Sequence, residues 1–318
     1  MRVIEVAEFG GPEVLRLGSR PDPVAGAGEV VVGIEFATVN PSDLGARSGG
    51  THRRVPGMPV PFVPGWDLAG TVLTIGEGVT RFRSGDQVIG MIPWVPVLAR
   101  VGAYAEAAAV EESWLAHVPD GLDLAAAATL PLSGLTAAQG IAILNPAPKS
   151  TLLVTGASGA VGWFATQLAV RAGCRVLALA SHGDEAWVAR IGAEVLPRGA
   201  DLAGAGRVDY VLDAVPLGPA AAAGLRKGGT AVFTRPPQDP APDGVTFETV
   251  WVEPDAASLE RLAADLAAGR LVTRVAEVIP LAEAARAHAI AERGGTRGKL
   301  VLATAREAMT ADKSQDSK

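Results

Sequence analysis

Residues 152–162 are the stretch whose residue types and spacing point most directly to chemistry: an apolar run that ends in a glycine-rich turn. An apolar helical segment, 163–172, follows the turn, and a second apolar segment, 175–180, follows the helix. A strand, a glycine turn, a helix N-terminus and a second strand form the unit that binds the pyrophosphate of a dinucleotide. The unpaired N–H groups and the positive dipole end of the helix attract the phosphates. We therefore expect a dinucleotide-binding site here.

Small residues are what such a turn requires. Gly159 allows the backbone to approach a pyrophosphate, and Gly162 allows the helix to pack closely on the strand. Ala157 stands where the usual pattern has its first glycine, so the run reads A-x-G-x-x-G. An ordinary glycine-rich turn can show the same pattern, but the position between two apolar segments favours a nucleotide site. The residues expected to bind the cofactor in this turn are Gly156, Ala157, Ser158, Gly159, Ala160, Val161 and Gly162.

The end of the second apolar segment bears on the choice of cofactor, because NAD-dependent enzymes usually place an acidic residue there to bind the ribose 2′-hydroxyl. This chain has Ser181 and His182 at that point, and neither repels a 2′-phosphate. Arg198 can add a bidentate contact to the same phosphate. These residues predict NADPH as the cofactor. The alternative is that Ser181 and His182 are turn residues and that Arg198 is a solvated loop charge.

Composition limits the classes of protein to which the chain can belong. Its 318 residues are long for one core, which predicts two domains. A net charge of −6 gives no basic footprint, so neither a nucleic acid nor an anionic membrane is expected as a partner. The single cysteine, Cys174, excludes an intramolecular disulfide and a multi-thiolate zinc site. Without a signal-peptide pattern or an apolar run of about 18 residues, we expect a cytoplasmic protein.

The elements that position these residues fall into two groups. Up to about residue 117, short apolar runs are punctuated by glycine and proline, which predicts a β-rich module. From about residue 120, helices and strands alternate, which predicts a parallel sheet with helices on both faces. A closing helix and strand are expected to return to the first module. The expected helices are 122–129, 135–144, 161–172, 186–191, 220–225, 256–268 and 284–291; the clearest expected strands are 30–36, 68–75, 87–92, 151–154, 176–180, 208–213, 229–233, 247–252 and 298–302.

A proline-rich segment at 52–64 predicts a mobile surface loop that covers a site. Aromatic side chains in and near such a loop suit a flat ligand. Core packing is the alternative for Phe62 and Trp66. The substrate-pocket candidates are Met58, Phe62, Trp66 and Trp94.

Further stretches occur in a fixed order along the chain: 8–15 (EFGGPEVL), 39–43 (VNPSD), 61–70 (PFVPGWDLAG), 83–88 (RSGDQV), 102–106 (GAYAE), 130–137 (LPLSGLTA) and 298–302 (GKLVL). With the glycine turn, they make the chain up to about residue 304 resemble the medium-chain dehydrogenase/reductase superfamily. Within it, the chain resembles the zinc-free branch of NADPH:quinone oxidoreductases. Zinc-dependent members carry a histidine where this chain has Trp66 and a cysteine near the position of Asn40. No metal site is therefore expected.

The resemblance implies an α/β fold with a GroES-like β-rich catalytic domain and a Rossmann-type domain that holds a doubly wound parallel sheet. The expected catalytic domain comprises residues 1–120 and 269–305, the expected Rossmann domain comprises residues 121–268, and residues 306–318 are expected to form a disordered tail. The active site is expected in the cleft between the domains.

The resemblance also points to residues around the nicotinamide. Asn40 and Asp43 are the catalytic candidates: the Asn40 amide can donate to the substrate carbonyl oxygen as negative charge develops there. Ser133 and Thr136 can present hydroxyls to the cofactor, although helix capping is an alternative role for both. The remaining candidates for cofactor contact are Asp213 and Phe233, and Phe233 can instead be a core aromatic. No residue stands out as a general acid, so solvent is expected to supply the proton.

The expected function is hydride transfer from NADPH to a quinone or a similar conjugated carbonyl. One alternative is an enone or enoyl reductase of a biosynthetic pathway, which would use the same machinery with a different pocket. Another is a non-catalytic NADPH-binding protein that acts as a sensor or interaction partner. The expected partners are a small-molecule substrate and a second copy of the chain, because Trp251 on a late strand is suited to an edge-to-edge dimer.

Overall fold

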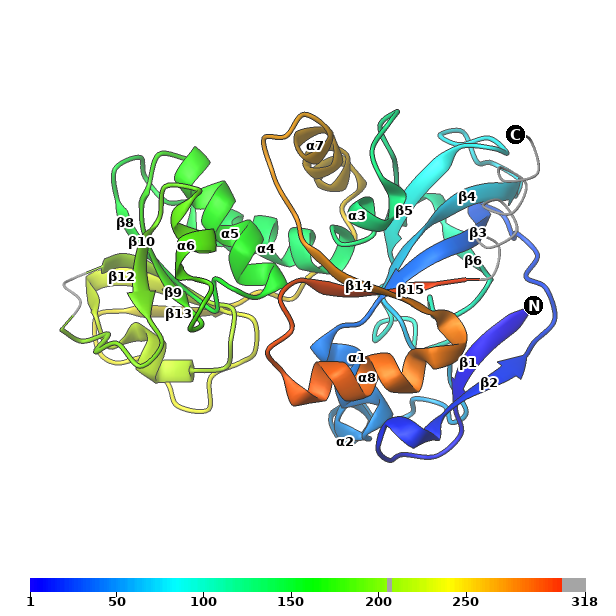
Figure 1. The fold of residues 1–318 in the computed structure, drawn as a ribbon, viewed down its shortest axis with the longest axis horizontal. Helices are drawn as coiled ribbons and strands as arrows, with labels where there is room; N and C mark the ends of the chain where they lie inside the picture. The colour runs from blue at the N-terminus through cyan, green and yellow to red at the C-terminus, as the bar shows by residue number, and fades with distance from the viewer. Residues whose placement is uncertain (205–207, 305–318) are drawn as a thin grey trace. The chain divides into compact units, whose positions relative to one another are not determined.

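The computed structural model describes residues 1–204 and 208–304 (Figure 1). The expected tail at 306–318 lies outside these ranges. The chain divides into two compact units, of which the first joins Met1–Leu132 to the chain from Pro254 and the second comprises Ser133–Glu253.

The unit boundaries differ from the expected ones at two places. Residues 121–132 and 254–268 group with the first unit rather than with the parallel sheet. The second difference arises because α7 (Ala256–Ala267) packs against β7 (Leu115–His117) and because Glu260 on α7 forms an ion pair with Arg81.

A seven-stranded sheet forms the centre of the first unit, with the strand order β14-β15-β3-β4-β5-β7 and β6 paired to β3. Its pairs are antiparallel except that of β14 with β15. A two-stranded antiparallel sheet, β1 with β2, accompanies it. Because β15 pairs with β3, residues near position 300 lie beside residues near position 38. The strands are β1 (Arg2–Val6), β2 (Leu15–Ser19), β3 (Glu29–Thr38), β4 (Asp67–Ile75), β5 (Gln87–Met91), β6 (Ala107–Glu111), β7, β14 (Val275–Pro280) and β15 (Lys299–Ala303).

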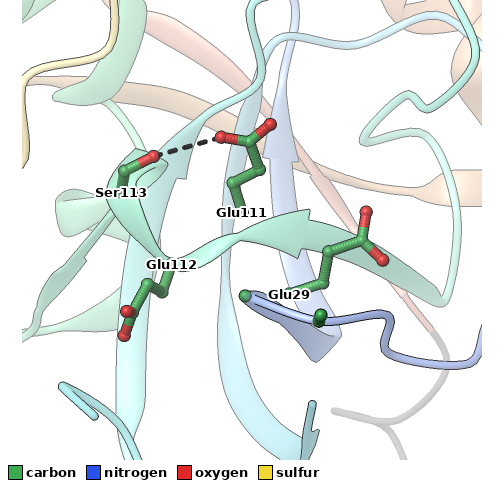
Figure 2. Close-up of a pocket in the computed structure, with 6 residues that line it drawn as sticks. Glu29, Glu111, Glu112 and Ser113 are labelled. Atoms are coloured by element: carbon green, nitrogen blue, oxygen red, sulfur yellow. Dashed lines mark hydrogen bonds between the residues drawn. The ribbon is translucent and has the colours of Figure 1, made fainter. Parts of the chain in front are cut away.

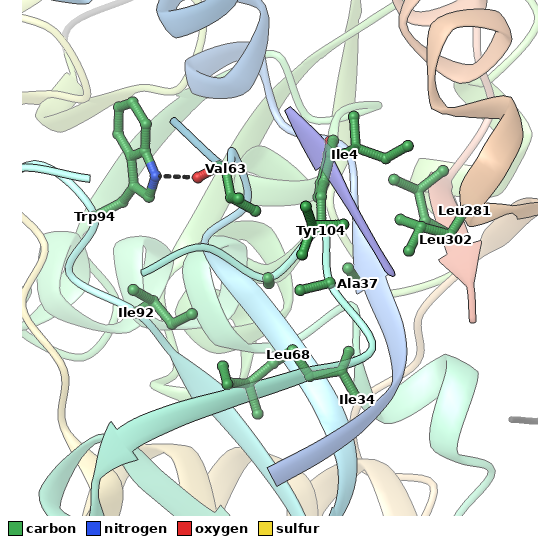
Figure 3. Packing of buried hydrophobic residues seen from close by; sticks show 14 of the residues in the cluster. Ile4, Ile34, Ala37, Val63, Leu68, Ile92, Trp94, Tyr104, Leu281 and Leu302 are labelled. Carbon is green, nitrogen blue, oxygen red and sulfur yellow. Dashed lines mark hydrogen bonds between the residues drawn. The ribbon is translucent and has the colours of Figure 1, made fainter. Parts of the chain in front are cut away.

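Helices surround this sheet, and α8 packs against α1 (Figure 1). Figure 3 shows part of the core, in which Ile34, Leu68 and Leu302 come from three neighbouring strands of the sheet. Each fully buried aliphatic side chain of this kind stabilises the fold by roughly 1.5–3 kcal/mol. The helical elements are η1 (Pro12–Val14), α1 (Pro41–Arg47), α2 (Gly50–Arg54), η2 (Glu112–Trp114), α3 (Leu124–Ala127), α7, η4 (Leu281–Glu283) and α8 (Ala284–Arg293).

The proline-rich segment 52–64 packs into the core of the first unit and is not the mobile surface loop that was expected. It overlaps α2 at its start, and Met58 is buried in the core. Near its end, Phe62 exchanges main-chain hydrogen bonds of 2.9 and 3.1 Å with Val6 and has no exposed surface. Burial of the two apolar side chains outweighs the loop tendency of the prolines between them.

A six-stranded parallel sheet, β10-β9-β8-β11-β12-β13, forms the second unit. Numbered along the chain, the strands have the order 3-2-1-4-5-6 of a dinucleotide-binding fold. The order in which strands are added to the sheet reverses between β8 and β11. The strands are β8 (Thr151–Thr155), β9 (Arg175–Ala180), β10 (Glu194–Pro197), β11 (Val208–Asp213), β12 (Leu225–Phe233) and β13 (Thr246–Thr249). The helical elements are α5 (Ala160–Arg171), α6 (Glu185–Ala189), η3 (Gly218–Ala222) and α4 (Pro131–Leu144), which begins at the boundary with the first unit.

Local structure departs from expectation at the predicted helix 220–225. The chain forms only the short 3₁₀ helix η3 there, and β12 already begins at Leu225, paired with Val208. Glycines bound the alanine run on both sides, so it is too short to sustain an α-helix. Strands β10 and β14 were not among the expected elements, because each is short and lacks a clear alternation of apolar residues.

Candidate functional site

Asn40 is the N-cap residue of α1, and its side chain lies between two charged groups. Nδ2 donates to Asp67 Oδ2 at 2.9 Å, and Oδ1 accepts a hydrogen bond from Lys299 Nζ. The opposite amide orientation would turn the NH₂ group toward the ammonium, so these two partners determine it.

Asp67 and Lys299 form a buried ion pair beside this amide, with Nζ 3.5 Å from Oδ2. The Asp67 side chain has no exposed surface, and that of Lys299 is 7% exposed. Asp67 also accepts hydrogen bonds from the Thr38 hydroxyl and from the Leu132 N–H, the latter at 2.6 Å. A buried pair offsets its desolvation cost when further hydrogen bonds fill its bonding positions, and Thr38, Leu132 and Asn40 supply such bonds here.

Three adjacent strands bring this cluster together. Asp67 begins β4, Lys299 begins β15, and Thr38 ends β3, which lies between those two strands in the sheet. We call Thr38, Asn40, Asp67 and Lys299 the Asn40 cluster. Asp67, Lys299 and Thr38 were not predicted as site residues. The available signal was a charged residue at the start of two apolar strands, in GWDLAG and GKLVL.

Asp43 holds the main chain of Asn40. Its Oδ2 accepts the Asn40 N–H at 2.8 Å, and its Oδ1 accepts the Gly65 N–H at 3.2 Å. Asp43 is the N3 residue of α1, so its bond to the Asn40 N–H belongs to the capping box at the start of this helix. Burial raises the pKa of Asp43 to about 7, with a further contribution from the charge of Asp67.

The four pocket candidates differ in their surroundings. Phe62 and Trp94 pack edge to face at 5.1 Å within the core, and the Trp94 indole donates to the Val63 carbonyl at 2.8 Å (Figure 3). Met58 is buried with them. Trp66 is only partly buried, and its indole Nε1 has no hydrogen-bond partner among the described residues. Of the four, Trp66 is the side chain with an unpaired polar atom, and that atom is buried.

The glycine turn of the second unit shows why small residues are required there. Gly156 follows β8 with a φ of +63°, and Gly159 is the N-cap of α5. A Cβ on Gly162 would lie 2.2 Å from the Gly156 carbonyl oxygen, so only glycine allows this approach of helix to turn. The Ser158 hydroxyl accepts the Ser181 N–H at 2.9 Å and thereby joins the turn to the end of β9. This geometry fits a pyrophosphate at the start of α5, whose first residues are Ala160 and Val161.

The residues predicted for a 2′-phosphate lie at one edge of the sheet. Pro197 pairs with Ala180 in the parallel register of β10 and β9, so Arg198 and Ser181 are the next residues of neighbouring strands. Ser181, His182 and Arg198 are all exposed. The His182 ring lies 3.5 Å from the Glu185 carboxylate, so Glu185 would compete with a 2′-phosphate for the imidazole.

The other cofactor candidates of this unit are buried. Asp213 accepts hydrogen bonds from the Thr155 hydroxyl and, at 2.9 Å, from the Gly218 N–H, so its carboxylate secures the loop that follows β11. Burial raises the pKa of Asp213. Phe233 has no exposed surface and packs edge to face on another core aromatic at 4.9 Å. Ser133 and Thr136 are buried in the first turns of α4.

The side chains around Asn40 do not fit a zinc ion, which needs three or four protein ligands. Within residues 1–204 and 208–304, no group of three or more His, Cys, Asp or Glu side chains is placed to hold a metal. Asp67 is already occupied by its four hydrogen-bond donors, one of which is the cation Lys299. Cys174 is buried in the second unit, 3.8 Å from the Ser150 hydroxyl.

A pocket of about 330 Å³ lies at the other end of β3 (Figure 2). Its three carboxylates already have hydrogen-bond donors: Glu29 and Glu112 accept main-chain N–H groups, and Glu111 accepts the Ser113 hydroxyl. Glu29 begins the strand that Asn40 follows, so this pocket is separate from the Asn40 cluster. The residues that line it are Ala27, Gly28, Glu29, Glu111, Glu112 and Ser113.

None of the helices in the described ranges is long and apolar enough to span a membrane.

Two family models match the chain: an alcohol dehydrogenase GroES-like domain over residues 26–120 and a zinc-binding dehydrogenase over residues 184–302. A quinone oxidoreductase of Lama guanicoe is 38% identical over 178 residues, which are 55% of this chain and 50% of that protein. A chloroplastic NADPH-dependent alkenal/one oxidoreductase of Arabidopsis thaliana is 31% identical over 242 residues, which are 73% of this chain and 62% of that protein. The chain thus spans about half to two thirds of the length of the curated relatives it matches.

Solved structures match over nearly the whole chain. The quinone oxidoreductase from Coxiella burnetii has a TM-score of 0.86 at 26% identity and covers 95% of this chain and 99% of its own. A mycobacterial protein in complex with NADPH has a TM-score of 0.80 at 30% identity, with 95% and 100% covered. By shared fold and sequence, the chain belongs to the medium-chain dehydrogenase/reductase superfamily, in the branch of the quinone oxidoreductases.

Proposed function

We propose that this chain is a zinc-independent oxidoreductase that transfers hydride from NADPH to a quinone or a similar conjugated carbonyl. The observation that carries the proposal is the Asn40 amide, held between a buried cation and a buried anion. An amide fixed in this way is the kind of preorganised donor that stabilises a developing oxyanion.

The second Nδ2 hydrogen of Asn40 makes only long hydrogen bonds to Thr38. Asp67 takes one Nδ2 hydrogen, and the nearest acceptors for the other are the Thr38 carbonyl at 3.4 Å and its hydroxyl at 3.5 Å. Both distances exceed the usual N–H···O range of about 2.7–3.2 Å. The Lys299 ammonium on Oδ1 draws electron density from the amide, which strengthens the remaining N–H as a donor. Asn40 would therefore stabilise negative charge on the substrate oxygen, and solvent would supply the proton.

The second unit would hold the cofactor, which supplies the hydride when bound. The main chain of residues 156–162 would bind the pyrophosphate, and Ser181, His182 and Arg198 would bind the 2′-phosphate. The parallel register that places Arg198 beside Ser181 supports NADPH over NADH, as does the NADPH complex of the mycobacterial relative.

Two alternatives have their own support. The alkenal/one oxidoreductase among the relatives favours an enone reductase with the same residues and a different pocket. A non-catalytic NADPH-binding protein would explain why the loop after Asp213, with Val215 and Pro216, departs from the usual glycine of the family.

One set of measurements separates these functions. Titration with NADPH and NADH, followed by tryptophan fluorescence, is expected to show tighter binding of NADPH. NADPH oxidation is then measured with a panel of quinones and a panel of alkenals, before and after dialysis against a chelator. Faster turnover of quinones, unchanged by the chelator, supports the proposal. Faster turnover of alkenals favours the enone reductase, NADPH binding without turnover favours the non-catalytic protein, and loss of activity on dialysis would contradict zinc independence.

We also propose that the chain pairs with a second copy through the second unit. β13 is the edge strand of the parallel sheet, and Trp251, two residues beyond its end, is 74% exposed. An open strand edge next to an exposed indole is suited to edge-to-edge pairing. Light scattering after size-exclusion chromatography should give twice the mass of the chain, and a monomer mass would overturn this proposal.

A further inference from the structure

A buried polar pair lies behind Asp43 and takes no part in the contacts of Asn40 described above. Tyr104 and His288 both have no exposed surface, and the Tyr104 hydroxyl lies 3.0 Å from His288 Nε2. Tyr104 also interacts with the Asp43 carboxyl, and the ring packs on Gly65, whose N–H donates to Asp43. His288 and Tyr104 therefore lead from α8 toward the residue that holds the Asn40 main chain.

Tyr104 is held rigidly in this position. Its N–H donates to the Pro64 carbonyl at 2.9 Å, and its carbonyl accepts the Ile4 N–H at 2.8 Å. The ring lies against Gly65, whose φ is +110° and where a Cβ would come 2.7 Å from the ring. Glycine at position 65 thus makes room for the phenol and also presents its N–H to Asp43.

The direction of the hydrogen bonds follows from the state of His288. Burial, together with the charge of Arg47, lowers the pKa of His288 to about 3, so the ring is neutral at pH 7. Its Nδ1 has no hydrogen-bond partner among the described residues. An unpaired buried acceptor is tolerated better than an unpaired buried N–H, which assigns the proton to Nε2. Nε2 then donates to the Tyr104 oxygen, and the phenol proton is left to donate to Asp43.

We propose that Tyr104 and His288 are positioning residues for Asn40: His288 orients the Tyr104 hydroxyl, Tyr104 donates to Asp43, and Asp43 in turn holds the Asn40 N–H. The inference rests on the proposed function in so far as Asn40 is the donor to the substrate. It assigns a role to Tyr104 and His288, neither of which touches the Asn40 cluster directly.

The charged groups around Asp43 affect the pH at which its carboxyl ionises. On its own helix it is preceded by Asn40 and followed by Arg47, whose buried guanidinium forms an ion pair with the exposed Glu292 of α8. Asp67 of β4 raises the pKa of Asp43, and Lys299 of β15 lowers it. Tyr104 and His288 face it from the remaining side, and Tyr104 stays protonated because burial and the two aspartates raise its pKa well above 10.

The role of Asp43 as an acceptor gives the sign of the pH effect. Its carboxylate accepts the bonds from Asn40, Gly65 and Tyr104 best when ionised, so kcat/KM should rise with pH through about 7. Removing the Tyr104 hydroxyl takes a donor away from the ionised form and raises the pKa of Asp43 further.

The test compares Tyr104→Phe with Tyr210→Phe, which removes the same hydroxyl from β11 of the other unit. The pKa of Asp43 is read by ¹³C NMR of its carboxyl carbon, assigned by its loss in Asp43→Asn, and the pH profile of kcat/KM is measured in parallel. In Tyr104→Phe both are expected to move upward by about one pH unit, with kcat reduced more than KM is raised. In Tyr210→Phe neither should move.

A second pair of variants covers the case in which Tyr104→Phe does not fold. His288→Gln keeps an N–H that can donate to Tyr104, whereas His288→Leu does not, so the upward shift should appear in the leucine variant and be reduced in the glutamine variant. Equal profiles for wild type and all folded variants would overturn the inference. If the wild type has no turnover but the NMR pKa still shifts, the proposed function fails and the hydrogen-bonded chain stands. If turnover is present and neither readout moves, the inference alone fails.

Discussion

The glycine turn of the second unit and the Asn40 cluster of the first unit are held in place by different means. The turn is a contiguous stretch, 156–162, in which main-chain conformation matters, and the predicted 2′-phosphate residues Ser181, His182 and Arg198 are exposed. The Asn40 cluster joins residues 38, 40, 67 and 299, all buried and hydrogen-bonded to one another. The first arrangement depends on the absence of side-chain atoms, and the second depends on paired charges.

This difference teaches which property each region controls. A main-chain cradle binds a ligand without bearing a charge of its own, so changes there should alter affinity. Burying a polar cluster costs desolvation free energy. The fixed dipoles and charges that result stabilise mainly the charge that develops during a reaction. Changes in the Asn40 cluster should therefore alter the rate and leave cofactor affinity unchanged.

The largest expected effect is that of Asn40→Ala. The variant removes the amide but leaves Asp67 and Lys299 paired, so the fold should persist while kcat/KM falls about a hundredfold and the Kd for NADPH stays the same. Steady-state kinetics and fluorescence titration measure the two quantities. Asn145→Gly is the control, because it removes an exposed amide that also precedes a proline, at the end of α4 in the other unit, and glycine tolerates the φ of +41° there. Unchanged kcat/KM in Asn40→Ala would remove Asn40 from the mechanism.

The glycine turn is tested by two substitutions that separate folding from binding. Gly162→Ala places a Cβ against main chain at 2.2 Å, so we expect a loss of about 1–3 kcal/mol in the free energy of unfolding together with weaker NADPH binding. Gly159→Ala meets the Gly156 oxygen only at 3.3 Å, and its φ of −86° suits alanine. Its stability should therefore change little while NADPH affinity falls about tenfold, because the methyl group lies where the pyrophosphate approaches. Denaturant unfolding and fluorescence titration distinguish the two. Wild-type affinity in Gly159→Ala would argue against a phosphate site at this turn.

The same contrast explains what could be predicted from the sequence. The fold class and the parallel sheet follow from local patterns, because each βα unit carries its own apolar period and its own turn. The glycine turn could be found for the same reason. Asp67 and Lys299 could not be paired in advance, since their contact depends on the register of β15 beside β3 and of β3 beside β4.

The burial of individual side chains also could not be predicted from local sequence patterns. Phe62 and Met58 stand among prolines that predict a surface loop, yet both are buried in the core of the first unit. Phe233 and Asp213 end strands at the expected edge of the sheet, but their side chains pack or bond inward. Which way a residue faces at the end of a strand depends on the packing of the neighbouring elements, and that packing is set by residues distant in the sequence.

The smallest expected effect concerns the choice between cofactors at the exposed edge of the second sheet. Arg198→Ala should raise the Kd for NADPH about fivefold and leave that for NADH unchanged, because one solvent-exposed charge contact contributes about 1 kcal/mol. Arg190→Ala is the matched control, since Arg190 is an exposed arginine nearby whose guanidinium lies over the Trp187 ring at 5.2 Å. Isothermal titration calorimetry at two salt concentrations measures the difference, which should shrink at the higher concentration. Equal weakening by the two variants would indicate a general attraction for anions rather than a 2′-phosphate site. Equal loss for NADPH and NADH would place Arg198 at a part of the dinucleotide that both cofactors share.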